Sequence, residues 1–299
     1  MTAFLQALAS GVVTGCVFAL IALSLVIIYK STDVINFAGG EVVMIGGYLG
    51  MFALLWLGLP YILVFVFGAV ATFVIGALFD RVVLNKVLGR SLPGQSILVA
   101  MVIATVGLSY VLKGSVRVVP YTEEPRGLPP VFTGDPIFLG NIVLQRQDVA
   151  IVVISIMIMV ALWAFFSFTF TGKALRATSQ NPRAAALVGV PVRRMRMAIW
   201  GLASALAAVA GILLVPKLLM TPDNMGVYVV LAFAAAIIGG FASLPGCIVG
   251  GVVLGVIQNF SGLYLSSQAI SVAPFLVIML VLVLKPQGLF GGKPKAKKV

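Results

Sequence analysis

The residues of this chain that could bind a polar solute are few, and one of them is a carboxylate in an apolar stretch. Glu41 ends the run 35–41, Ile-Asn-Phe-Ala-Gly-Gly-Glu, which opens the second long apolar segment. A carboxylate at membrane depth is costly and usually faces a bundle interior or a cavity. Asn36 offers hydrogen-bond donors and acceptors, and the glycines permit an unwound turn. We therefore expect residues 35–41 to form a polar elbow beside a solute path, with four candidate residues: Asn36, Phe37, Gly40 and Glu41. The alternative is that Glu41 only satisfies the backbone of a broken helix.

A second polar feature is a basic segment between two apolar runs. Residues 172–196, called the basic loop below, contain no acidic residue and six basic ones: Lys173, Arg176, Arg183, Arg193, Arg194 and Arg196. The positive-inside rule places such a loop in the cytoplasm. It would then be the largest polar surface that the chain offers to a cytoplasmic partner. A membrane-surface turn held by anionic lipid is the alternative.

The middle of the basic loop carries the signals of a short helix. Asn181 suits the N-cap position and Pro182 the first helical position. Gly189 stands where a left-handed residue ends a helix, and Pro191 prevents the helix from resuming. The sequence predicts a compact helix over residues 182–188, with small residues on a face that fits a groove on another protein.

The composition decides the class of protein. The chain is 61% hydrophobic and 9% charged, and its mean hydropathy is +1.17, whereas soluble domains are about 25% charged. We expect an all-α, polytopic transmembrane helical bundle. The net charge of +12 could suggest nucleic acid, but the charges lie in short loops and a tail without interleaved aromatic residues. We expect membrane lipid, and no nucleic acid, as a partner.

Several kinds of chemistry are disfavoured. The chain contains no histidine, which removes His-based catalysis, Ser-His triads and His-ligated metals. Cys16 and Cys247 lie in apolar segments, so neither a disulfide nor a metal pair is expected. No GxxxxGK[ST] motif occurs, so uphill transport would need an ion gradient or another polypeptide. We expect no catalytic residue, no cofactor and no metal ion in this chain.

Apolar runs of about 20 residues predict membrane spans. The clear candidates are 4–29, 35–58, 60–79, 97–119, 148–171, 197–216 and 269–285. Basic residues in the loop 80–96, the basic loop and the tail predict that these face the cytoplasm, whereas the acidic loop 120–147 is predicted to be periplasmic. We expect one permease domain over 1–292, a basic cytoplasmic tail over 293–299, a periplasmic N-terminus and a cytoplasmic C-terminus. Lys113 and Arg117, near the outer end of their span, are explained by snorkelling and receive no role.

Segment 229–260 is too long for one span and short for two, about 48 Å if fully helical. Four helix-breaking residues interrupt it: Gly239, Gly240, Pro245 and Gly246. We predict two short helices hinged near residues 243–245, either crossing as a hairpin or re-entering, which gives seven to nine spans. Such breaks often mark transport pathways, and a simple packing hinge is the alternative. Four GxxxG pairs predict close helix packing: Gly11/Gly15, Gly46/Gly50, Gly246/Gly250 and Gly251/Gly255.

These segments together resemble the permease family of branched-chain amino acid ABC importers, of the LivH type. The resemblance runs from about residue 10 to residue 291 and rests on four stretches in order: 35–41, 172–196, 239–251 and 285–291. It implies a bacterial inner-membrane permease for branched-chain or related small amino acids, amides or organic acids. It also implies a second homologous permease subunit (LivM-like), two cytoplasmic ATPase subunits that bind ATP and Mg²⁺, and a periplasmic solute-binding protein.

The run Arg183-Ala184-Ala185, followed by Gly189, resembles the importer coupling signature, whose short helix docks in an ATPase groove. Arg183 stands where that signature has an acid, and Gly39 stands where many members have histidine. The resemblance implies that ATPase closure pushes residues 182–188 and rocks the adjoining spans. The residues alone leave an ion-coupled transporter or channel open, with Glu41 as its coupling carboxylate. A membrane-embedded enzyme lacks histidine, a GxSxG elbow and an intramembrane carboxylate pair.

Overall fold

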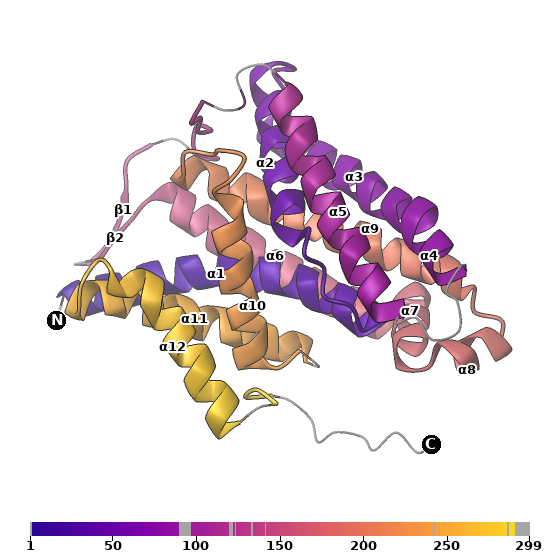
Figure 1. Ribbon diagram of the computed structural model, residues 1–299. Helices are drawn as coiled ribbons and strands as arrows, with labels where there is room; N and C mark the ends of the chain where they lie inside the picture. The colour runs from indigo at the N-terminus through magenta and orange to yellow at the C-terminus, as the bar shows by residue number, and fades with distance from the viewer. Residues whose placement is uncertain are drawn as a thin grey trace.

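The computed structural model describes residues 2–89, 97–119, 122, 124–132, 134–140, 142–241, 243–285 and 287–290. Within these residues the helices are joined by turns and loops, and the one pair of strands is a hairpin, β1 (Ile137–Leu139) and β2 (Ile142–Leu144), which the sequence did not predict. The predicted all-α bundle is confirmed (Figure 1). The predicted basic tail 293–299 lies outside the described residues.

Nine described helices are apolar, and they correspond to the seven predicted spans and the predicted pair. Six are long enough to cross a membrane: α1 (Thr2–Thr32), α3 (Tyr61–Phe79) with its continuation, α5 (Ile97–Val118), α6 (Arg146–Phe168), α9 (Val192–Leu214) and α11 (Leu244–Tyr264). Three are shorter: α2 (Gly39–Leu55), α10 (Met225–Gly239) and α12 (Ala269–Leu284). The remaining elements are short or amphipathic: the π-helical segment η1 (Asp80–Leu84), α4 (Asn85–Gly89), α7 (Phe170–Gln180), α8 (Pro182–Leu187) and the 3₁₀ turn η2 (Val215–Lys217).

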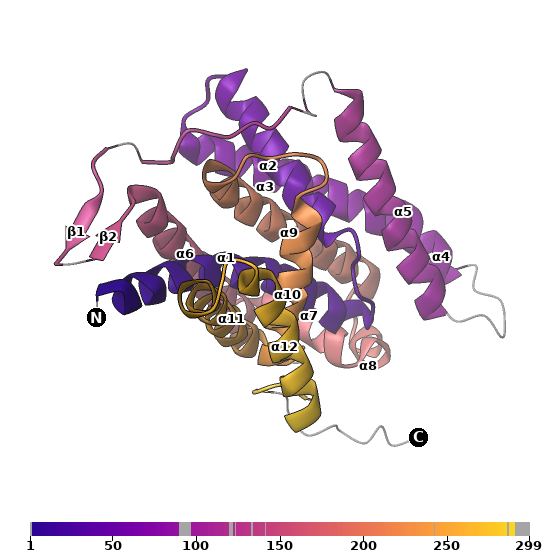
Figure 2. The same ribbon diagram turned by 60° about the vertical axis from the view of Figure 1, so that its left-hand side comes forward.

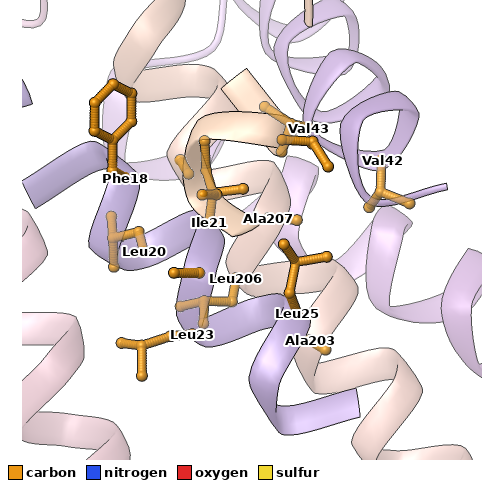
Figure 3. Close-up of a cluster of buried hydrophobic side chains, with 14 of the residues drawn as sticks. Phe18, Leu20, Ile21, Leu23, Leu25, Val42, Val43, Ala203, Leu206 and Ala207 are labelled. Atoms are coloured by element: carbon orange, nitrogen blue, oxygen red, sulfur yellow. The ribbon is translucent and has the colours of Figure 1, made fainter. Parts of the chain in front are cut away.

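Helix α1 runs through the middle of the bundle. Figures 1 and 2 show α9 on one side of it and α11 with α12 on the other. Its side chains are buried continuously from Gly15 to Ile28, as expected for a helix that is apolar on every face. Figure 3 shows Leu25 of α1, Val42 of α2 and Ala203 of α9 in the same cluster of buried hydrophobic side chains. The small residues of α9 allow α1 and α2 to approach it closely.

Glycines set the contact between α1 and α11. A Cβ atom on Gly11 would lie 2.7 Å from Cα of Val256, and one on Gly255 would lie 2.4 Å from the backbone nitrogen of Gly15. No side chain fits in these gaps, so the two backbones touch. The close packing predicted from the GxxxG pairs is confirmed for this helix pair.

The break predicted in segment 229–260 is confirmed, although the helix pair is longer than predicted. Helix α10 ends at Gly239 and α11 begins at Leu244, with the Ser243 hydroxyl accepting a hydrogen bond from Gly246 N. The end of α10 is covered by residues 288–290: Leu289 N donates to Ile238 O (2.7 Å) and Phe290 N donates to Gly239 O (3.1 Å). The carbonyl groups at a helix end need such partners, so the C-terminal segment acts as the cap of α10.

Candidate functional site

The predicted elbow is present between α1 and α2. Asn36 is buried, and its side-chain oxygen accepts a hydrogen bond from Ala38 N at 3.1 Å. The Asn36 side chain therefore shapes the turn that starts α2 and does not line an open surface. Phe37 is 47% exposed, and its backbone N–H donates to the Thr105 hydroxyl of α5 at 3.4 Å. Of the elbow residues, Phe37 presents the accessible side chain.

Glu41 is buried in the first turn of α2 and forms an ion pair with Lys113 of α5, Oε1 to Nζ 3.5 Å. Lys113 also lies 3.7 Å from the carboxylate of Asp223, which binds Arg117 at 2.8 Å. These four residues, called the charge chain below, carry two positive and two negative charges. They link α2, α5 and the loop before α10.

Snorkelling was therefore the wrong explanation for Lys113, because its ammonium group pairs with a buried acid. A signal for this pairing was present in the sequence. A carboxylate inside the membrane needs a compensating charge, and Lys113 and Arg117 are the basic residues of the predicted span 97–119. The sequence could not show that the two helix faces meet, because that depends on helix rotation and depth.

A row of aromatic rings connects the elbow with the break after α10. Phe37 lies 6.4 Å from Phe233 of α10, Phe233 lies 6.0 Å from Phe241, and Phe241 lies 5.0 Å from Tyr29 of α1. These are ring-centroid distances, and they fall in the range of favourable aromatic pairs. The two candidate regions predicted separately, the elbow and the hinge, are thus brought together through Phe233.

The short helix predicted in the basic loop is confirmed as α8. The Asn181 side-chain oxygen accepts a hydrogen bond from Ala184 N at 3.0 Å, and Pro182 occupies the first turn. At the other end Gly189 has φ +86°, Gly189 N donates to Ala186 O, and Val190 N donates to Ala185 O, both at 3.0 Å. This is the bonding pattern of a Schellman motif. Both ends of α8 are therefore fixed by its own sequence.

The predicted small-residue face of α8 is exposed at Ala184 and Ala186, and Ala185 is the buried residue of this helix. Ala185 is 4% exposed because it packs against its own chain. The larger exposed apolar residues are Leu187 (89%) and Val188 (78%) at the end of α8. Arg183 and Ala184 are also exposed. A partner would therefore meet the Leu187–Val188 end, while Ala185 fixes α8 on its own support.

Arg196 of the basic loop is not available to a partner, because its side chain forms an ion pair within the chain. Its guanidinium Nε lies 2.6 Å from a carboxylate oxygen of Asp80, which is fully buried, and it also binds the Asn85 side chain. This contact joins the start of α9 to η1 and α4, which belong to the loop 80–96 that was also predicted to face the cytoplasm. The two loops predicted on one side of the membrane thus lie at the same end of the bundle (Figure 1).

The opposite end of the bundle carries the N-terminus and the β1–β2 hairpin (Figure 1). The Gln6 side chain of α1 bonds both backbone groups of Val143, at 2.8 and 3.0 Å. The predicted outer loop 120–147 and the N-terminus are therefore neighbours, as the topology prediction requires. Cys16 and Cys247 are buried and free. Within the described ranges, no group of three His, Cys, Asp or Glu side chains could hold a metal ion.

Known proteins resemble this chain over almost its whole length. It is 32% identical to the high-affinity branched-chain amino acid transport system permease protein LivH of Escherichia coli K12, covering 99% of this chain and 98% of that protein. It is 30% identical to the corresponding protein BraD of Pseudomonas aeruginosa, with the same coverage. A probable LivH protein of Methanocaldococcus jannaschii is 26% identical over 95% of this chain and 91% of its own length.

A solved structure supports the fold. PsaBC from Streptococcus pneumoniae in complex with Fab matches 96% of this chain and 93% of its own, with a TM-score of 0.51 and 15% sequence identity. At this identity the likeness concerns the fold alone. A family model described as "Branched-chain amino acid transport system / permease component" matches residues 7–284. Together with the apolar helices, these comparisons identify the chain as a multi-pass membrane protein that belongs to the family of branched-chain amino acid transport system permease components.

Proposed function

We propose that this chain is the translocation subunit of an ATP-driven importer for branched-chain amino acids or related small amino acids, amides or organic acids. In this proposal it lies in the bacterial inner membrane with its N-terminus in the periplasm and its C-terminus in the cytoplasm. Its partners are a second, homologous permease subunit, two ATPase subunits that bind ATP and Mg²⁺, and a periplasmic solute-binding protein. The names of the relatives support the solute class.

The observation that carries the proposal is the construction of α8. Its ends are capped by Asn181 and Gly189, while Leu187 and Val188 are exposed within the part of the chain that the structure describes. A short rigid helix with an exposed apolar end is suited to a groove on another protein. We infer that the cytoplasmic ATPases bind this end of α8.

A displacement of α8 can be transmitted into the bundle through α9. Pro191 leads directly into α9, whose first turns are tied to η1 by the Arg196–Asp80 pair. Further along, α9 packs against α1, α2 and α3. Movement of α8 would therefore shift α9 together with the helix that carries the elbow, and the path would open alternately to each side. The chain itself hydrolyses no ATP in this scheme.

The elbow and the charge chain are the proposed lining of the solute path. Phe37 offers an apolar surface, and Lys113 with Asp223 offers one positive and one negative group nearby. An amino acid carries an ammonium and a carboxylate group, so groups of both signs suit it. Selectivity would come mainly from the solute-binding protein.

The ion-coupled transporter is disfavoured by one contact. Such a carrier would need a carboxylate that takes up and releases an ion, and Glu41 was the candidate. Glu41 instead shares its charge with Lys113. We expect it to serve as a fixed partner of α5.

Reconstitution tests the proposal. Full-length chain is purified with the subunits that accompany it, and uptake of leucine is measured with and without internal ATP. We expect uptake to require ATP and nucleotide-binding subunits to co-purify. The double variant Leu187→Ser, Val188→Ser should lose both uptake and co-purification. Leu265→Ser, which changes another highly exposed leucine beyond α11, should lose neither. Uptake driven by an ion gradient without ATP would refute the proposal.

A further inference from the structure

A groove of about 680 Å³ opens where the end of α1 meets α6, α7 and the start of α11. None of its lining residues belongs to the elbow or to α8. Its walls are largely apolar and include Trp163 of α6 together with Leu244 and Ile248 of α11. The volume falls in the range of sites that hold an organic ligand, about 300–1,000 Å³.

Two positive charges line the same groove. Lys30 lies in the last turn of α1 and Arg176 lies on α7, and both side chains line the groove. Within the part of the chain that the structure describes, neither forms an ion pair with a carboxylate, and Asp33, three residues after Lys30, does not pair with it. Two like charges beside an apolar wall favour an anion between them.

The depth of the groove in the membrane follows from α7. This helix turns Leu175 and Thr178 inward and exposes Lys173 and Arg176. An amphipathic helix with basic residues on its polar face lies at the boundary between headgroups and acyl chains. It directly follows the span α6, where the half-exposed Trp163 faces outward, and tryptophan is enriched at that boundary. The two cations thus lie at headgroup level, and the apolar walls extend from there towards the hydrocarbon.

We propose that this groove binds one anionic phospholipid. Its phosphate lies between the Lys30 ammonium and the Arg176 guanidinium, and an acyl chain lies along Trp163, Leu244 and Ile248. A zwitterionic lipid would bring its own positive group to a site that already has two. The lipid connects α1, α7 and α11, and this role is independent of which solute crosses the bundle.

Fluorescence quenching tests the site. The full-length chain carrying Trp56→Phe, with the subunits that accompany it, is placed in phosphatidylcholine nanodiscs that contain a small share of brominated lipid. The Trp163 signal is the difference between this complex and the same complex that also carries Trp163→Phe, and Trp200 is buried in the core. We expect brominated phosphatidylglycerol to quench Trp163 more strongly than brominated phosphatidylcholine. Each cation should account for about fivefold of this preference.

Matched variants make the test specific. Lys30→Gln and Arg176→Gln should each weaken the preference, and together they should abolish it. Lys173→Gln, which removes a neighbouring charge of α7 outside the groove, should leave it unchanged. Lys30→Arg should also retain it, which separates loss of charge from misfolding.

Three results would overturn the proposal. One is equal quenching by the two brominated lipids. Another is displacement of the brominated lipid by glycerol phosphate as effectively as by phosphatidylglycerol, since this would show a site for phosphate alone. The third is protection of Trp163 from both lipids in the complex and its exposure once the accompanying subunits are removed, since a protein would then fill the groove.

Discussion

The Lys113 ammonium lies 3.5 Å from the Glu41 carboxylate and 3.7 Å from that of Asp223, so one cation of α5 serves an acid of α2 and an acid of the loop before α10. The two acids differ in burial: Glu41 is nearly inaccessible, and Asp223 is exposed. Removing Lys113 and removing Glu41 should therefore lower the stability of the protein by different amounts.

Lys113→Met should destabilise the protein more than Glu41→Gln. Without Lys113, Glu41 is left as an unpaired buried charge, a loss of about 3–5 kcal/mol in comparable cases. Without Glu41, Lys113 retains Asp223 as a partner. The double variant should regain part of the stability lost in Lys113→Met. Thermal unfolding of the purified chain in detergent measures all three, and a larger loss in Glu41→Gln would contradict the pairing described here.

Arg196→Met should unfold the junction between α9 and η1. Asp80 is fully buried and would lose its cation, so we expect a loss of about 3–5 kcal/mol. Arg194→Met, an exposed arginine of the same helix turn, is the control and should stay within about 0.5 kcal/mol. The two variants are compared by their midpoints in a thermal unfolding series. Similar midpoints would show that Arg196 behaves as an ordinary loop residue.

Gly189→Val should remove transport by loosening the end of α8, although no atom stands in the way of a side chain there. The reason is the φ angle of +86°, a conformation that costs other L-residues about 1–2 kcal/mol and β-branched ones more. Gly189→Asn should keep most of the uptake, because asparagine tolerates this region. Both variants should insert normally into the membrane, as measured with a reporter fusion. Equal uptake by the valine and asparagine variants would contradict this explanation.

Gly255→Leu should separate α1 from α11, because its side chain would need space that the backbone of Gly15 occupies. We expect less folded chain in detergent extracts, and size-exclusion chromatography measures this loss. Gly107→Ala on α5 is the control, since no atom lies within 4 Å of the added Cβ. Helix propensity predicts that this alanine stabilises the helix by up to about 1 kcal/mol. Aggregation of Gly107→Ala alongside Gly255→Leu would show that glycine spacing does not separate packed from open positions.

The helices themselves could be predicted because apolar runs and helix-ending residues are local signals. The α8 caps at Asn181 and Gly189 and the break at Gly239–Gly240 follow from such signals. Ion pairs between distant segments could not be predicted in the same way. Lys113 with Glu41 and Arg196 with Asp80 depend on the rotation and depth of each helix. The division of the predicted span 148–171 at Thr169, where α7 begins as a separate helix, was also missed.

The cap that Leu289 and Phe290 form over the end of α10 has a consequence for biogenesis. These two residues leave the ribosome after every described helix has been made. Until then the carbonyl groups of Ile238 and Gly239 lack these two donors. The end of α10 can therefore receive its full set of hydrogen-bond partners only after translation has passed residue 290.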